Sequence, residues 1–274
     1  MRNTLMMCTM LVFCCLAMGC SHMNTAWSSS NVQEIRVLLL TGQNNHDWRR
    51  TTAKLQSILE EAGFIVEVTQ TPQTLTAEQL KNHHVILSNW NTFGPGEKVR
   101  TWPNTTRKAY EDFVRNGGGH VVVHAGSCSF YDWREYHEIG LATWIVDQTH
   151  HAPVGEFPVR IDSSNHPVTR GLAPFRTTDE LWNRARVQEH TVVLASGFAS
   201  KEARGTDNWE PIAFAGTFGR GHCFTLLLGH NADAMDNPGY RAMLLRGLEW
   251  AATGMVRRTA HLSTVRDESV SAMP

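Results

Sequence analysis

Short apolar runs and polar segments alternate along the first half of the chain. The runs at residues 35–40, 64–68, 85–87 and 121–124 have the composition of parallel strands that are buried on both faces. Residues 51–61 and 107–115 predict helices between them, the first with Leu55, Ile58 and Leu59 on one face. This alternation is typical of a doubly wound α/β sheet.

The second half of the chain is richer in predicted strands, at residues 157–161, 191–195, 212–215 and 223–228, and a last helix is predicted over residues 240–251. No internal repeat is visible. We therefore expect a single α/β domain over residues 34–254, built on one doubly wound, mostly parallel sheet of the flavodoxin-like kind, followed by a loose tail over residues 255–274.

The first 20 residues predict a targeting segment. Residues 5–18 are apolar but too short to span a membrane comfortably, and they end in Ala17-Met18-Gly19-Cys20, which resembles a bacterial lipobox. We expect a lipoprotein signal peptide over residues 1–20, lipidation at Cys20 and a flexible tether over residues 21–33. This predicts a lipid-anchored protein of the bacterial cell envelope that faces the periplasm. Ser21 after the cysteine favours the outer membrane as its location. Ordinary secretion without a lipid is the alternative.

Charge and cysteine content exclude two classes of function. The chain has 25 Lys and Arg against 26 Asp and Glu and no basic stripe, which argues against a nucleic-acid partner. Only Cys128 and Cys223 follow the signal region, so neither a disulfide framework nor a zinc finger is expected. Nine tryptophans are many for this length; those near loops suit stacking on sugars, although core packing is the commoner role.

Polar side chains follow several of the predicted strands. An apolar run precedes each of these side chains, which are His46, Asn89, His124 and the pair His230-Asn231. In open α/β sheets, ligands bind at the carboxyl ends of the strands. Polar clusters at residues 147–151 and 178–182 lie outside the predicted strands. Several histidines with carboxylates at one sheet edge have the composition of a site for zinc or its first-row neighbours.

The order of these landmarks resembles the trehalose-utilisation, or ThuA-like, family. The resemblance is carried by Gly42 and His46, the run from Leu59 to Phe64, Gly117-Gly118-Gly119 with Val123-His124-Ala125, His151, the run from His166 to Leu172, Asp179-Glu180-Leu181-Trp182, the runs 211–214 and 219–224, Gly229-His230 and the run 248–251. It implies a fold like that of the class I glutamine amidotransferases and a sugar-related role. Members often accompany dehydrogenases that oxidise glycosides to 3-keto sugars. The family register favours His151 over His150 as a site residue. Residues 125–128 and 144–147 depart from the family pattern.

Together these features predict a ThuA-like lipoprotein that processes a carbohydrate, by metal-assisted isomerisation, elimination or hydrolysis of a keto-glycoside. A divalent metal, with zinc favoured, would be held by candidates from His46, His124, His151 and His230, and Glu180 would bind it or move a proton beside His124. The candidate substrate contacts are Trp48, Asn89, Trp90, Asp179, Trp182 and Asn231, although Asp179 could instead cap a turn. No nucleotide cofactor is expected, the lipid would be the contact with the membrane, and a homo-oligomer stays open.

Two other functions stay open at this point. One is a non-catalytic lipoprotein that binds sugar, which the aromatic loops serve equally well. The other is a cysteine-dependent hydrolase of the amidotransferase type. In that fold a nucleophilic cysteine occupies a strained turn after a central strand, but here the turn reads His124-Ala125-Gly126 and Cys128 lies beyond it.

Overall fold

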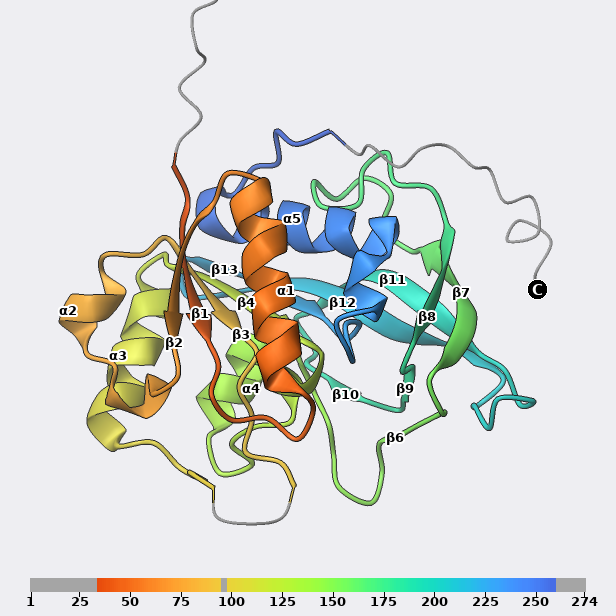
Figure 1. Ribbon diagram of the computed structural model, residues 1–274, viewed down its shortest axis with the longest axis horizontal. Coiled ribbons are helices and arrows are strands. Elements are labelled where there is room, and N and C mark those ends of the chain that lie inside the picture. Colours follow the sequence, from red (N-terminus) through yellow and green to blue (C-terminus); the bar gives the residue numbers. More distant parts are fainter. Residues whose placement is uncertain (1–33, 95–97, 260–274) are drawn as a thin grey trace, which may run out of the picture. The chain divides into compact units, whose positions relative to one another are not determined.

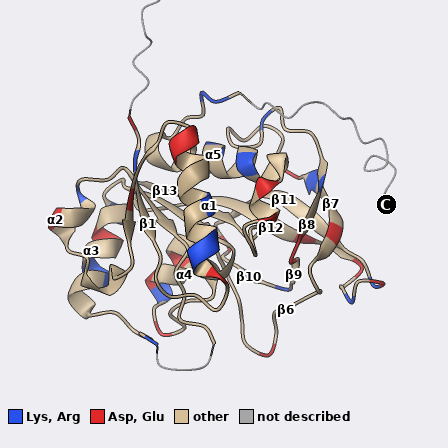
Figure 2. Cartoon of the chain, in the orientation of Figure 1, with Lys and Arg blue, Asp and Glu red and all other residues tan. Residues whose placement is uncertain are grey.

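The computed structural model describes residues 34–94 and 98–259 (Figure 1). The predicted signal peptide, the lipidation site at Cys20, the tether and the tail beyond residue 259 lie outside the described residues. In the described part, no helix has both the length and the apolar character needed to cross a membrane. Figure 2 shows basic and acidic positions interspersed over these elements.

A nine-stranded sheet forms the centre of the described part. Its order is β2-β1-β3-β4-β13-β12-β11-β7-β8. The strands are β1 (Arg36–Leu40), β2 (Ile65–Thr69), β3 (Val85–Ser88), β4 (Gly119–Val123), β7 (Gly155–Ile161), β8 (Phe175–Asp179), β11 (Val192–Ala199), β12 (Asn208–Phe218) and β13 (Gly221–Leu226). Four two-residue strands pair in two small ladders: β5 (Ala142–Thr143) with β10 (Arg186–Val187), and β6 (His150–His151) with β9 (Trp182–Asn183).

Strand directions divide this sheet into two halves. From β2 to β13 all neighbours are parallel, whereas from β13 to β8 all neighbours are antiparallel. Only β12 and β7 run against the other seven strands, so the carboxyl ends of β1, β3, β4, β13 and β8 all lie at one edge of the sheet.

Helices cover both faces of the sheet, as its buried strands require. The helices are α1 (Trp48–Glu61), α2 (Ala77–Leu80), α3 (Asn104–Arg115), α4 (Arg134–Gly140) and α5 (Pro238–Thr253), with single 3₁₀ turns η1 (Pro72–Thr74), η2 (His124–Ser127) and η3 (Ala234–Asp236). Leu39 of β1 packs with α1 and α5 in one core cluster, and its neighbour Leu38 packs with α2, α3 and α4 in the other. This alternation along one strand is the pattern of a three-layer α/β domain.

The predicted α/β fold is confirmed, and every predicted strand and helix is present with ends shifted by a few residues. The sequence analysis missed α2, α4, β8 and the four short strands. Of these, β8 matters most for the site, because Asp179 is its last residue and Glu180 follows it.

Candidate functional site

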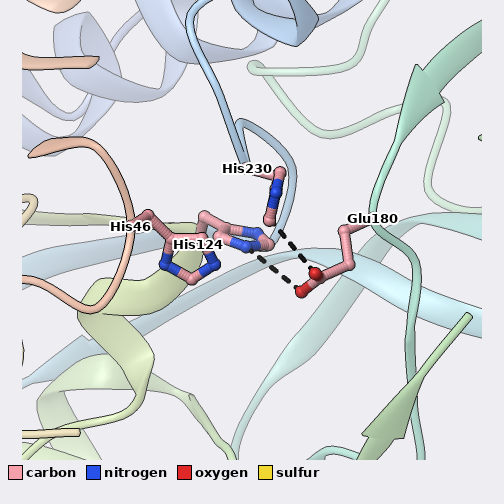
Figure 3. A group of neighbouring side chains, drawn as sticks. All are labelled: His46, His124, Glu180 and His230. Carbon is pink, nitrogen blue, oxygen red and sulfur yellow. Dashed lines mark ion pairs between the residues drawn. The ribbon is translucent and has the colours of Figure 1, made fainter. Parts of the chain in front are cut away.

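Four side chains from distant parts of the chain meet at the carboxyl edge of the sheet (Figure 3). His46 follows β1, His124 follows β4, His230 follows β13 and Glu180 follows β8. One potential ligand atom from each lies within 4.8 Å of the corresponding atoms of the others. The prediction that His46, His124 and His230 converge was based on their positions after parallel strands, and the structure does bring them together with Glu180.

His124 occupies a strained turn directly after the central strand β4. Its φ is +40°, in the left-handed region that residues with a side chain seldom adopt. Gly126 allows the turn to lie against β3, because a Cβ there would stand 2.6 Å from the carbonyl oxygen of Ser88. The sequence analysis compared this turn with the place of a nucleophilic cysteine, and the structure places an imidazole there.

Hydrogen bonds fix the orientation of the His124 ring. Its Nδ1 lies 2.8 Å from the carbonyl oxygen of Leu227, which can only accept, so Nδ1 donates. In the neutral ring this leaves the lone pair on Nε2, which is buried and has no hydrogen-bond partner among the described residues. Histidines that bind a metal typically donate their other ring N–H to a carbonyl or carboxylate in this way, which fixes the tautomer.

His46 is held in the same manner from the loop after β1. Its Nδ1 lies 3.1 Å from Oδ1 of Asn44, and that oxygen also accepts from the backbone N–H of His46 and from Nδ2 of Asn91. Because Oδ1 of Asn44 is an acceptor, Nδ1 of His46 donates and Nε2 keeps its lone pair. Burial, with the nearby rings of His124 and His230, lowers the pKa of His46 to about 3, so the ring is neutral at physiological pH.

The Glu180 carboxylate lies against three imidazoles. Oε1 is 3.5 Å from Nε2 of His124, and Oε2 is 3.1 Å from Nδ1 of His230 and 3.3 Å from Nδ1 of His151. Burial alone would raise the pKa of Glu180, but interactions with His124 and His230 outweigh it and hold that pKa far below its usual range. The carboxylate in turn raises the pKa of His124 against the opposing effect of burial. Each of these two residues thus favours the charged form of the other.

The nearby Glu180 carboxylate does not give every imidazole nitrogen a hydrogen bond. Nδ1 of His230, like Nε2 of His124, is buried and has no hydrogen bond of proper geometry among the described residues, although each nitrogen lies near the carboxylate. Buried polar atoms without hydrogen bonds are rare in native proteins, and a bound ion is one standard explanation. Nitrogen lone pairs beside a carboxylate are the donor set that zinc and similar ions prefer.

Asp179 holds the backbone of this site in place. Its carboxylate is buried and accepts from the N–H groups of Glu180 (2.8 Å), Gly229 (2.6 Å) and His230 (3.1 Å). Burial raises the pKa of Asp179, while the neighbouring His124 and these hydrogen bonds act in the opposite direction. Asp179 thus ties the end of β8 to the loop after β13, which agrees with the alternative from the sequence that Asp179 caps a turn.

The other predicted residues divide between the site and the core. Trp182 lies beside it, with its ring 5.2 Å from that of His124 and its Nε1 donating to Oε1 of Glu180. His151 also lies beside it; its side chain is 45% exposed, and its Nδ1 lies 2.9 Å from the carbonyl oxygen of Ala152. His151 is therefore near the carboxylate but outside the four-residue group. Trp90 is turned away, because its ring is 2% exposed and stacks on Phe130 in the core.

Three further candidates have structural contacts. Asn89 is buried and donates to Oγ1 of Thr51, and Oδ1 of Asn231 accepts from the N–H of Ala234 at the start of η3. Trp48 begins α1 and carries the guanidinium of Arg49 over its ring, 4.3 Å from the centroid. The described side-chain contacts of these three do not reach the four-residue group, although the backbone N–H of Trp48 donates to the carbonyl oxygen of His46 (2.8 Å), so the structure gives them supporting positions around it.

Sequence reasoning missed Asn44 and Trp144. The ring of Trp144 lies 5.1 Å from that of Trp182 and 5.9 Å from that of His151. Asn44 was detectable as a polar residue of the same loop as His46, whereas Trp144 lies in a segment that departs from the family pattern. Cys128 and Cys223 are buried free thiols whose pKa values burial raises, which argues against a cysteine nucleophile.

A comparison with protein families matches the family model described as trehalose utilisation, ThuA, over residues 36–251. The chain belongs to the ThuA family. The match includes all four residues of the site and all nine strands of the main sheet. The family resemblance stated from the sequence is thereby confirmed.

Solved structures agree with this assignment. A ThuA-like protein from Parabacteroides merdae is 28% identical to this ThuA-family chain, with a TM-score of 0.73 over 83% of this chain and 93% of that one. A second ThuA-like protein, from Bacteroides uniformis, shares the fold at 20% identity, with a TM-score of 0.61 over 82% of this chain and 95% of that one. The search of curated proteins gave no match.

Proposed function

We propose that this ThuA-family protein is a metal-dependent enzyme that acts on a carbohydrate, with His46, His124 and His230 as the metal ligands and Glu180 as the group that moves a proton. The observation that carries the proposal is the convergence of three imidazoles on one carboxylate, with two of their nitrogens buried and without a hydrogen bond among the described residues. The family description supports the sugar as substrate.

The ligand set fits a catalytic metal better than a structural one. Structural zinc sites are closed by four protein ligands, usually including thiolates, whereas catalytic sites have three protein ligands and keep a position for water or substrate. Three histidines supply such a set, and the buried, protonated thiol of Cys128 is not part of it. The hydrogen bonds from His46 to Asn44 and from His124 to Leu227 leave Nε2 of each ring available.

Glu180 is placed to transfer protons at the boundary of the site. It is ionised, Nε1 of Trp182 fixes its Oε1, and its Oε2 lies beside the half-exposed His151. A metal bound beside it would act as a Lewis acid that polarises a carbonyl or hydroxyl oxygen of the sugar. Glu180 would then accept a proton from the polarised substrate and return it, as isomerisation, elimination and hydrolysis each require.

Elemental analysis of tag-free protein tests the metal part of this proposal. We expect about one divalent ion per chain in the wild type, with three protein ligands at about 2.0–2.2 Å. The variant His230→Ala should lose the ion, while His150→Ala should retain it. His150 is the matched control because it is the exposed neighbour of His151 on β6. Wild-type protein without metal after growth and dialysis with added zinc, manganese, iron or cobalt would refute the metal site.

Turnover of trehalose and of its 3-keto derivative tests the enzyme part. Glu180→Gln should retain the ion and lose turnover by about 10²–10⁴-fold, the typical contribution of a positioned acid or base. Tight binding of either sugar without conversion under any of the metals would instead support a sugar-binding protein. Turnover that survives both His124→Ala and Glu180→Gln would show an enzyme with a different site.

The location of the protein is a separate proposal. We infer from the apolar segment that ends at Cys20 that the chain is a lipid-anchored protein of the cell envelope facing the periplasm. A periplasmic position would give the site access to sugars before their uptake into the cytoplasm.

A further inference from the structure

Aromatic rings extend outward from the buried histidines. The ring of His124 lies 5.2 Å from that of Trp182, which lies 5.1 Å from that of Trp144, and Trp144 lies 6.1 Å from Phe93. Burial decreases along this path: His124 and Trp182 are buried, whereas Trp144 and Phe93 are partly exposed. The path therefore leads from the proposed metal ligands to the surface.

Trp144 is held firmly in this position. Its backbone N–H donates to the carbonyl oxygen of Ser127, the last residue of the turn that begins at His124. The next residue, Ile145, donates its N–H to the buried hydroxyl of Thr149, which itself donates to the carbonyl oxygen of Arg184. The loop that carries Trp144 is thus tied both to the turn of His124 and to the segment after β9.

The neighbouring side chains make this an amphipathic surface. His151 pairs with Trp182 across the β6–β9 ladder, and its half-exposed imidazole lies 5.9 Å from the Trp144 ring. A partly exposed indole therefore stands beside a polar ring, and that ring in turn lies 3.3 Å from the Glu180 carboxylate. A pyranose has the matching character, because its C–H groups form an apolar face with slightly positive hydrogens, its hydroxyls point outward, and aromatic faces are electron-rich.

We propose that Trp144 is the stacking platform for a pyranose ring of the substrate, with Phe93 at its outer edge, and that it presents the sugar to His151 and Glu180. This subsite rests on the proposed function and specifies its substrate class as cyclic sugars. It replaces Trp90, whose ring is in the core, and it differs from Trp48, whose ring lies against the guanidinium of Arg49 and has no described ring contact with the histidines. A preorganised platform of this kind binds without the cost of ordering a loop.

Two substitutions at Trp144 test the platform. Trp144→Phe retains an aromatic face, whereas Trp144→Leu retains apolar packing against Trp182 without one. We expect Trp144→Leu to bind trehalose about tenfold more weakly, the effect of losing contact with about 60 Å² of apolar surface, and Trp144→Phe to bind close to the wild-type value. Titration calorimetry on the metal-loaded protein measures both dissociation constants, and elemental analysis checks that the metal content is unchanged.

Mannitol and a second tryptophan are the controls. Mannitol carries hydroxyls but has no ring face, so its affinity should not change between the wild type and Trp144→Leu. Trp209, on β12, is partly exposed like Trp144, but its ring packs against Phe198 and the guanidinium of Arg160, and Trp209→Ala should leave trehalose binding unchanged.

The outcomes separate this inference from the proposed function. If Trp144→Leu and Trp144→Phe bind trehalose equally well, stacking is refuted, while metal content and turnover in the wild type still support the enzyme. If the wild type binds metal but neither trehalose nor its 3-keto derivative, the platform and the carbohydrate function both fail. Equal weakening of trehalose and mannitol in Trp144→Leu would show a general change in the site and would also refute the platform.

Discussion

Replacing Asp179 by Asn should weaken metal binding without changing any ligand. The two oxygens of Asp179 accept three backbone N–H groups, and the shortest of these bonds, 2.6 Å, joins Oδ2 to Gly229. In Asp179→Asn one oxygen can still accept from Glu180 and His230. The new NH₂ group, however, faces the N–H of Gly229. Both groups are donors, so the N–H of Gly229 loses its acceptor.

The size of this effect follows from the contacts. A hydrogen bond to a charged group contributes about 1.5–3 kcal/mol, and a buried polar group left without a partner costs about 1–3 kcal/mol. Burial raises the pKa of Asp179, which shows that its charge is costly, so the neutral amide recovers part of this loss. We expect the free energy of unfolding to fall by about 2–4 kcal/mol, which a domain with a stability of about 5–15 kcal/mol survives.

The loop that Asp179 anchors also carries His230. Gly229 has φ +98°, and a Cβ there would stand 2.8 Å from the ring of Tyr240, so the turn has little freedom to adopt another form. Loss of a group that orients a ligand typically reduces metal affinity about 10–100-fold. Urea unfolding gives the stability, and competition with a chromophoric chelator gives the metal affinity.

Thr177→Val is the matched control. Thr177 lies two residues before Asp179 on β8, is 2% exposed, and has a hydroxyl without a hydrogen-bond partner among the described residues. Its replacement by a side chain of similar shape should leave both stability and metal affinity unchanged. If Asp179→Asn binds metal as tightly as the wild type, Asp179 does not position His230 and our account of this loop is wrong.

Three further predictions concern other parts of the chain. Burial lowers the pKa of His120 from 6.5 to about 3, so below pH 6.5 the unfolded chain binds a proton that the folded protein does not. Stability should therefore decrease by up to about 1.4 kcal/mol per pH unit as the pH falls from 6.5 towards 3, and urea titrations of His120→Gln should show a shallower decrease; an unchanged pH profile would contradict this. Because the Cys128 thiol is buried and its pKa is raised, Cys128→Ala should keep full turnover and the native wild type should resist iodoacetamide, whereas loss of turnover would revive the cysteine mechanism. Cys20→Ala should release the protein from membranes in fractionation experiments, and membrane retention without a lipid mass would count against the lipoprotein prediction.

Local patterns predicted the parallel half of the fold and the three histidines. Each of β1, β4 and β13 is a short apolar run that is buried, and His46, His124 and His230 follow these runs in the sequence. Since parallel neighbours end at one edge, position after a strand was enough to bring the histidines together. The same rule was insufficient for Trp90, because it places a residue at the edge but does not give the direction of its side chain.

Glu180 required information that no local pattern contains. It follows β8, whose sequence Phe-Arg-Thr-Thr-Asp has one apolar residue, and β8 lies four strands away from β13 in the sheet. In a flat sheet that separation is about 19 Å. The antiparallel half curls towards α5 instead: Nδ2 of Asn237 donates to the carbonyl oxygen of Arg176, and Gly239 has no side chain to keep Phe175 away. Curvature of this kind depends on tertiary contacts, so the polar cluster at residues 178–182 and the family resemblance marked Glu180 as a candidate but could not show how it reaches the histidines.

Three costs of folding coincide at the carboxyl edge of β4. His124 has a strained backbone, its Nε2 and the Nδ1 of His230 are buried without hydrogen bonds, and Glu180 places a carboxylate in the interior beside them. Each feature costs about 1–3 kcal/mol, and none improves the packing of the core. A sequence free to optimise stability would remove them, as it has satisfied the partly buried Oδ1 of Asn44 and the buried hydroxyl of Thr149 nearby. Their concentration in one place is therefore best explained by a ligand that compensates for them, and a cation held by nitrogen lone pairs beside a carboxylate would offset the unpartnered nitrogens and the buried negative charge at once.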